Sequence, residues 1–339
     1  MIEIDDTVDT KIVQREDIKP VFLTYYKKAS FIGLNSKRYI LWNNKLVEEG
    51  VLQRSSNTIT SRDINEHNFI SENSYKRIFV FTENYGDRNI AHWMLEQLPV
   101  ILYFIELLKT YPDIKIIINK NRRANMNSLI KDYILAIPNI NPENILNIDL
   151  TSIKINADEL YIGNSLGCNM TNFYNIWNKI HQNINFTVNN NFITNTNANN
   201  KIYISRRNLL ESNKQTNTRI MVNLEDISDL LVNKGYTEIY TDEIDNLKDR
   251  INLFKSAKEI IMELGAGIYN LLYCPDEIDV KIMYQDNNIS WLQEFYPMFK
   301  NKKFRVKLIS GTKINNKHNG NWLNTPWILN KNKLITYLD

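Results

Sequence analysis

From Arg77 onward, short apolar runs alternate along the chain with segments whose apolar residues recur at helical spacing. The runs predict buried strands, and the helical spacing between them predicts helices. The expected strands are IFVF (78–81), KIIIN (115–119), ILNIDL (145–150) and ELYIG (159–163). The expected helices lie at 90–108 and about 125–136, and Pro138 closes the second. Repeated strand-helix-strand order predicts a parallel, right-handed open sheet.

A second alternation begins after residue 200. Asn223 is expected to cap a helix that Gly235 ends, and another helix is expected at about 246–257. The pattern predicts a second doubly wound α/β half, with a Gly-Ala-Gly turn after its third strand. The expected strands are YIS (203–205), TEIY (237–240), EIIMEL (259–264), VKIMY (280–284) and FRVKLI (304–309).

Two α/β domains are expected, because 339 residues with 43% apolar side chains are enough to build two cores. Asparagine supplies nine of the 18 residues at 183–200, which predicts a connector rich in turns. We therefore expect two Rossmann-like domains that face a central crevice, where the carboxyl ends of the strands meet a ligand. The expected parts are an N-terminal α/β domain with a β-rich opening segment (1–185), a linker (186–200), a C-terminal Rossmann-like domain (201–312) and a tail packing back across the domains (313–339).

Charge and cysteine content narrow the function classes. Lysine and arginine number 41 against 38 acidic residues, and a net charge of +3 argues against a nucleic-acid partner. Cys168 and Cys274 have no metal-ligand spacing, so neither a zinc site nor a disulfide framework is expected. The N-terminus lacks the apolar run of a signal peptide, and no run reaches the roughly 18 apolar residues of a membrane span. We expect a cytoplasmic protein, and loose contact with the inner face of a membrane stays open.

The first candidate site is the segment Asn89 to Pro99, just after the first expected strand. His92 and Glu96 are four residues apart and share one face of the expected helix. Either side chain could accept a proton from a sugar hydroxyl as that hydroxyl attacks. The alternative is an ordinary polar pair on a solvated helix face.

The second candidate is Arg206 with Arg207, at the end of the first strand of the second half. A planar guanidinium can bind a phosphate through two parallel hydrogen bonds, which lysine does less well. Successive strand residues point to opposite faces, so a regular strand aims at most one of the two arginines into a crevice. A surface pair of arginines is the alternative.

The third candidate is the turn Gly265-Ala266-Gly267, with Asn270 shortly after it. Glycine lets the backbone approach a ligand, and the amides of the following helix attract a diphosphate. Glycine used only for packing is the alternative. The chain contains no GxGxxG, no P-loop, no HExxH and no GxSxG, which argues against dehydrogenases, ATPases, zinc proteases and serine hydrolases. We therefore expect a reaction without metal or cofactor.

Four segments together resemble glycosyltransferase family 61 in order and spacing. Members commonly show N-x-x-H-W-x-x-E/D-x-L-P, I-S-R-R, R…N-E-x-E and H-G-A-G-L-x-N-L-L-F-x-P. The matching segments here are NIAHWMLEQLP (89–99), YISRRN (203–208), Arg219 with NLED (223–226), and LGAGIYNLLYCP (264–275). Two positions depart from the pattern: Leu264 stands where the family has histidine, and Leu224 where it has glutamate.

The resemblance implies an inverting, metal-independent transferase of the two-domain GT-B kind that uses a nucleotide-sugar donor. It also implies a glycan or glycolipid acceptor, with bacterial relatives serving capsule and surface polysaccharide synthesis. By this likeness Arg206, Arg207 and the Gly265–Gly267 turn would bind the diphosphate, and Asn270 would support the turn. His92 and Glu96 would serve catalysis on the acceptor side, with supporting roles for Asn89, Arg219 and Glu225. Because of Leu264, a non-catalytic relative that binds nucleotide-sugar or glycan as an assembly subunit remains the alternative.

Overall fold

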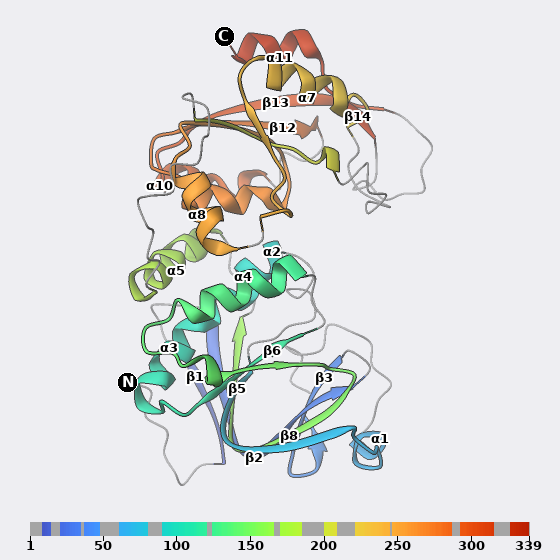
Figure 1. The fold of residues 1–339 in the computed structure, drawn as a ribbon, viewed down its shortest axis with the longest axis vertical. Helices are drawn as coiled ribbons and strands as arrows, with labels where there is room; N and C mark the ends of the chain where they lie inside the picture. The colour runs from blue at the N-terminus through green and yellow to red at the C-terminus, as the bar shows by residue number, and fades with distance from the viewer. Residues whose placement is uncertain are drawn as a thin grey trace. The chain divides into compact units, whose positions relative to one another are not determined.

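The structure is a computed structural model of the chain, and its ribbon is drawn in Figure 1. It divides into two compact units, Met1–Phe186 (unit 1) and Thr187–Asp339 (unit 2). The expected linker (186–200) starts at this boundary, and all of it except Asn200 lies outside the described residues, so it stays a prediction. The residues that the structure describes are 9–14, 21–34, 37–47, 61–80, 90–120, 124–165, 170–184, 200–208, 221–244, 246–286, 292–314 and 326–338.

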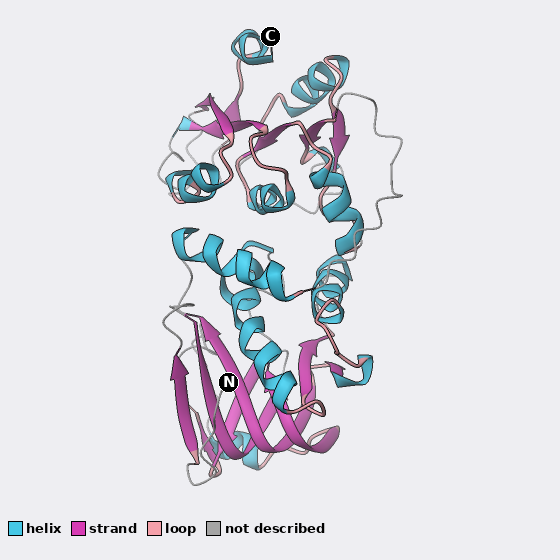
Figure 2. Ribbon diagram, turned by 90° about the vertical axis from the view of Figure 1, so that its left-hand side faces the viewer, coloured by secondary structure: helices cyan, strands magenta, loops and turns pink. Residues whose placement is uncertain are grey.

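Unit 1 is built on an eight-stranded mixed sheet, in which the path β4-β3-β2-β8-β5-β6-β7 is hydrogen-bonded and β1 pairs with β2. Strands β8, β5, β6 and β7 run parallel, whereas β2 is antiparallel to β8, β3 and β1. The strands are β1 (Thr10–Gln14), β2 (Val21–Leu34), β3 (Lys37–Trp42), β4 (Lys45–Leu46), β5 (Ser71–Val80), β6 (Lys115–Asn119), β7 (Ile145–Ile148) and β8 (Ser152–Ser165). Figure 2 shows the strands in magenta.

The mixed sheet corrects the expectation of a doubly wound parallel sheet for this half. The β-rich opening segment does not form a separate layer, because its strands join the parallel ones through the long β2–β8 pairing, from Val21 opposite Ser165 to Leu34 opposite Ser152. The expected strand 159–163 is only the second half of β8. In the first half of β8 apolar residues alternate with polar ones, because only one face of the strand is buried there. The sequence-based prediction did not recognise this alternation as a strand.

The expected helix at 90–108 is a continuous helical path over 90–110 that changes type along its length. The segments are α2 (Ile90–His92), the π-helix η2 (Trp93–Gln97), the 3₁₀ helix η3 (Leu98–Val100) and α3 (Ile101–Thr110). Pro99 has no amide to continue an α-helix, so the bonding pattern must shift around it. The amide of Leu98 accordingly donates to the carbonyl oxygen of Trp93, the spacing of a π turn.

By length and composition this path could cross a membrane, but most of it is buried inside the protein. Seven of the ten side chains of α3, among them Tyr103 and Phe104, are buried, as in a core helix. The other helices of unit 1 are α1 (Ser61–Asn65), α4 (Ala124–Leu135), the 3₁₀ helix η4 (Pro142–Asn144) and α5 (Met170–Asn183).

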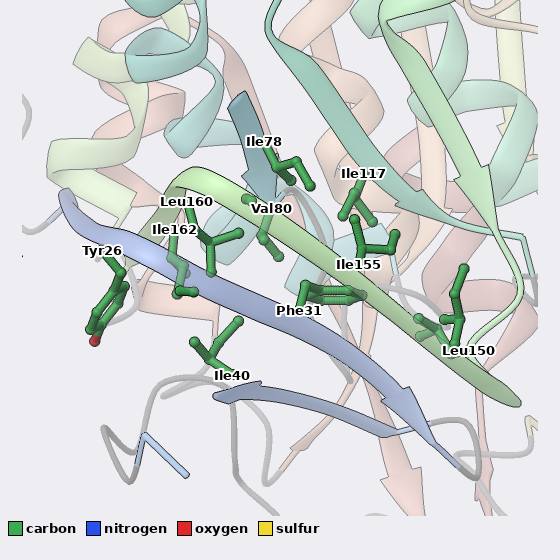
Figure 3. Packing of buried hydrophobic residues seen from close by; sticks show 13 residues of the cluster. Tyr26, Phe31, Ile40, Ile78, Val80, Ile117, Leu150, Ile155, Leu160 and Ile162 are labelled. Carbon is green, nitrogen blue, oxygen red and sulfur yellow. The ribbon is translucent and has the colours of Figure 1, made fainter. Parts of the chain in front are cut away.

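One face of the sheet carries a cluster of buried aliphatic and aromatic side chains, which Figure 3 shows. The labelled members come from β2, β3, β5, β6 and β8 and from the segment after β7. Because strands far apart in sequence contribute to it, the cluster ties the opening segment to the parallel strands. Its labelled residues are Tyr26, Phe31, Ile40, Ile78, Val80, Ile117, Leu150, Ile155, Leu160 and Ile162.

Unit 2 contains a six-stranded sheet in the order β10-β9-β11-β12-β13-β14. The first five strands are parallel, and β14 is antiparallel to β13. After β9 the chain adds β10 on one side of it, and then adds β11, β12 and β13 on the other side. The strand order therefore reverses between β9 and β11. The strands are β9 (Lys201–Ile204), β10 (Thr237–Ile239), β11 (Glu259–Glu263), β12 (Asp279–Gln285), β13 (Arg305–Lys313) and β14 (Trp327–Ile328).

The described end of the expected tail, residues 326–338, packs in the core of unit 2, and residues 315–325 lie outside the described ranges. Trp327 and Leu334 pack in the cluster formed by α7 and the sheet. Asn223 stands at the start of α7 as expected, but its side chain does not cap the helix. Its amide instead donates to the Leu329 carbonyl oxygen (2.8 Å) and accepts from the Leu329 amide (3.2 Å), which fixes the tail. The helices are α7 (Leu224–Asn233), α8 (Leu247–Lys255), the 3₁₀ helix η5 (Ala266–Tyr273), α10 (Tyr296–Asn301) and α11 (Lys331–Leu338).

Gly163 is required where η3 meets the sheet of unit 1. A Cβ at Gly163 would overlap Val100 and lie 3.1 Å from the ring of Phe79. We expect Gly163→Ala to lower the free energy of unfolding by about 1–3 kcal/mol, because overpacking forces the helix away from the strand. Denaturant unfolding measures this. Gly265→Ala is the control, since an added Cβ there meets nothing closer than 3.9 Å. Equal stability of both variants would show that the helix yields without cost.

Candidate functional site

The carboxyl ends of β9 and β11 lie side by side in unit 2. Ile204 is paired with Met262, so Arg206 leaves one strand and Gly265 leaves its neighbour at the same edge of the sheet. A Cβ built on Gly265 would lie 3.9 Å from Nη1 of Arg206. This edge is where the strand order reverses, and in open α/β sheets ligands bind there, beyond the carboxyl ends of the strands.

The two arginines have different surroundings. Arg207 donates from Nη1 to Asp229 of α7 (2.9 Å) and from Nη2 to Glu238 of β10. The hydrogen bond with Glu238 raises the pKa of Arg207 above its ordinary value. Arg206 is partly exposed, and none of the other described residues forms a hydrogen bond or ion pair with its side chain. Arg207 therefore connects the end of β9 to α7 and β10, whereas the guanidinium of Arg206 has no such contact within the described ranges.

Gly265 and Ala266 begin the turn from β11 into η5. The Leu264 amide donates to Met283 of β12 (2.8 Å), and the Ile268 amide donates to the Gly265 carbonyl oxygen (3.0 Å). The first amides of a helix have no partner within it, and they carry a partial positive charge. The start of η5 can therefore receive an anion beside Arg206.

Neither conformation nor packing inside the protein requires glycine at position 265. Its backbone is extended (φ −177°), a conformation that any residue adopts. The atoms nearest to an added Cβ are 3.9 Å away, whereas at Gly267 they are the Ile204 and Met262 side chains at 3.4 and 3.5 Å. The missing side chain at 265 thus leaves open space next to Arg206, as a site for a closely approaching ligand needs.

The buried side chain of Asn270 hydrogen-bonds to the Gly265–Gly267 turn. It is 1% exposed, its Nδ2 donates to the Gly267 carbonyl oxygen (2.8 Å), and its Oδ1 accepts from Nη1 of Arg250 (2.7 Å). Asn270 is therefore hydrogen-bonded to the turn, and its role in donor binding stays a prediction. The sequence-based prediction did not single out Arg250. The pattern that could have indicated it is its helical spacing from Leu247 and Phe254, which places an arginine on the apolar face of α8.

The N-terminal candidate is described only in part. His92 ends α2 and is partly buried, and Glu96 lies in the π-helix without a described side chain. Asn89 lies outside the described residues. Trp93 of the same motif is fully buried, with its ring 4.9 Å from that of Tyr133. The motif therefore anchors a core helix, and the roles of His92 and Glu96 stay predictions.

The remaining sequence candidates are Arg219, Glu225 and the two leucines at positions 224 and 264. Arg219 is not among the described residues, and Glu225 is exposed in the first turn of α7. Leu224 and Leu264, the two departures from the family pattern, are both buried, at 3% and 4% exposure. They contribute to packing where a polar side chain is usual.

Thiol and metal chemistry find little support in the described part of unit 2. Cys274 is buried, and burial raises the pKa of its thiol, which keeps it protonated. Cys168 lies outside the described residues. Within the ranges that the structure describes, no three His, Cys, Asp or Glu side chains come together as metal ligands. Metal independence stays a prediction.

Comparison with known proteins agrees with the motifs. The family model described as Glycosyltransferase 61 matches residues 90–281, which is more than half of the chain. The match runs from the start of α2 through the Gly265–Gly267 turn to β12, and it includes Arg206 and Arg207. A search of curated proteins finds no match. The chain belongs to glycosyltransferase family 61, a family of sugar-transferring enzymes.

Proposed function

We propose that the chain is an inverting glycosyltransferase of the GT-B kind that binds the diphosphate of a nucleotide-sugar at the carboxyl edge of β9 and β11. The supporting observation is the space at Gly265 beside Arg206, whose side chain forms no hydrogen bond or ion pair with another residue that the structure describes. The transferred sugar is a hexose or pentose, and the acceptor is a glycan or glycolipid of surface polysaccharide synthesis. The reaction takes place in the cytoplasm, at or near the inner face of the membrane.

The leaving group determines what this edge must do. As the bond between the anomeric carbon and the diphosphate oxygen breaks, negative charge grows on the phosphates. The Arg206 guanidinium and the amides at the start of η5 are donors suited to that charge. Arginine and helix amides can supply this stabilisation without a metal ion.

The acceptor is activated by a base. A hydroxyl of the acceptor attacks the anomeric carbon from the side opposite the departing diphosphate, which inverts its configuration, and Glu96 or His92 takes the hydroxyl proton. The nucleoside diphosphate leaves with the bonding electron pair. This assignment follows from the NIAHWMLEQLP segment and its place in the family pattern.

A non-catalytic relative that binds the donor as an assembly subunit is the second candidate. The buried Leu264 favours it, because a leucine in the core offers no hydrogen bond to a phosphate. The two candidates share the donor site and differ in turnover, so donor binding and sugar transfer are measured separately.

Arg206→Ala is expected to weaken binding of a nucleoside diphosphate about tenfold or more, since a hydrogen bond to a charged group contributes about 1.5–3 kcal/mol. Gly265→Ala is expected to weaken it too, because the added methyl group takes the space beside Arg206 that the diphosphate would occupy. Titration calorimetry with UDP, GDP and CDP measures it. Lys258→Ala is the matched control, because it removes one positive charge from the exposed residue before β11, at the opposite end of the strand. If Lys258→Ala weakens binding equally, the effect is one of overall charge.

Arg207→Ala is expected to act on stability. It leaves Glu238, 11% exposed, without its guanidinium partner, so we expect a loss of about 1–3 kcal/mol in the free energy of unfolding. Denaturant unfolding gives the loss, and Arg206→Ala should leave stability within about 0.5 kcal/mol. A stable Arg207→Ala protein that has lost nucleotide binding would return the phosphate role to Arg207.

Glu96→Gln and His92→Ala separate binding from transfer. Removing a general base is expected to slow sugar transfer about 10²–10⁴-fold, so at least one variant should show this loss while both bind the nucleoside diphosphate as the wild type does. Product formation from a panel of nucleotide-sugars gives the rates. Full rates in both variants would remove the base assignment, and binding without transfer in the wild type would favour the non-catalytic relative.

A further inference from the structure

Arg250 is a buried charged side chain that no sequence motif singles out. It is the fourth residue of α8 and is 3% exposed, on the helix face that also buries Leu247 and Phe254. A guanidinium taken out of water is costly unless hydrogen bonds replace its hydration. Its contacts therefore show what the burial achieves.

Those contacts connect the 3₁₀ helix η5 to the loop after β10, two segments that follow the carboxyl ends of parallel strands. Nη1 of Arg250 donates to Oδ1 of Asn270 in η5 (2.7 Å). Nη2 donates to the carbonyl oxygen of Thr241 (2.6 Å) and, more weakly, to that of Ile244 (3.4 Å), both in the loop after β10. The short bonds are typical of a charged donor. Arg250 thus holds η5 and the loop after β10 at a fixed separation.

Asn270 in turn is hydrogen-bonded to the Gly265–Gly267 turn. Nδ2 of Asn270 donates to the carbonyl oxygen of Gly267 (2.8 Å), so two consecutive hydrogen bonds join Arg250 to the turn. Gly265 and Gly267 give this turn more conformational freedom than other residues would. Holding the Gly267 carbonyl holds the first turn of η5, and with it the direction of the preceding amides.

We propose that Arg250 is a positioning residue of the donor site, which acts through Asn270 to keep the amides of the Gly265–Gly267 turn directed at the diphosphate. This inference rests on the proposed function. Arg250 itself does not touch the ligand. Two nitrogens of one planar fork bond to Asn270 and to the loop after β10 at once, which a single lysine nitrogen cannot reproduce.

The test is the selectivity of the loss in Arg250→Lys. We expect about tenfold weaker binding of the diphosphate among UDP, GDP and CDP that the wild type binds, and unchanged binding of the matching nucleoside. Calorimetry measures the first, and ligand-observed NMR the second. In a double-mutant cycle with Asn270→Ala, the double variant should lose no more than the worse single variant, since both break the same connection.

Asn270→Asp is a second variant that tests the connection should Arg250→Lys fail to fold. The carboxylate still accepts from Arg250 but cannot donate to Gly267, so the same selective loss of diphosphate binding is expected. Unchanged diphosphate affinity in the folded variants, beside a clear loss in Arg206→Ala, would overturn the role of Arg250. Equal loss for nucleoside and diphosphate would overturn it too, as a general effect on the fold. If the wild type binds no nucleoside diphosphate, the proposed function fails and this inference fails with it.

Discussion

The parallel pairing of β9 with β11 is the constraint on which the proposed donor site depends. The strand order reverses between these two strands, so the chain leaves them toward opposite sides of the sheet, and open α/β sheets commonly bind ligands beyond the carboxyl ends of such strands. The pairing of Ile204 with Met262 sets the register that brings Arg206 beside Gly265. A shift in that register would separate the arginine from the turn, although neither local segment would change.

Buried or partly buried polar contacts then determine which side chains remain available. Arg207 is held by Asp229 and Glu238, and Arg250 by Asn270 and the loop after β10. Each of these charges is stabilised by several hydrogen bonds, and each fixes an element that borders the site. No other described residue forms such contacts with Arg206, which is why Arg206 is the arginine proposed to bind the diphosphate.

The departures from the family pattern have a common physical character. Leu224, the first residue of α7, packs in the core of unit 2, and Leu264 is buried directly after β11. At both positions this chain has apolar packing where relatives place a polar side chain. The pattern of the site is kept in its backbone, the Gly265–Gly267 turn and the start of η5, more than in these two side chains.

The sequence by itself was sufficient for the α/β class, for the strand and helix at the turn, and for the candidate set around Arg206 and Gly265, because these depend on local periodicity and on glycine. It did not reveal the mixed sheet of unit 1, since the alternation in the first half of β8 indicates a strand with one covered face but does not say that its antiparallel partner is β2, more than 100 residues earlier in the chain. Only the tertiary structure showed that Arg207 is bound by acidic side chains whereas Arg206 differs from it in this respect. It also showed that the Asn223 side chain hydrogen-bonds to Leu329 instead of capping its own helix. The physical reason is that a hydrogen-bond partner is chosen by proximity in the folded chain, and proximity between distant segments is decided by strand order and register.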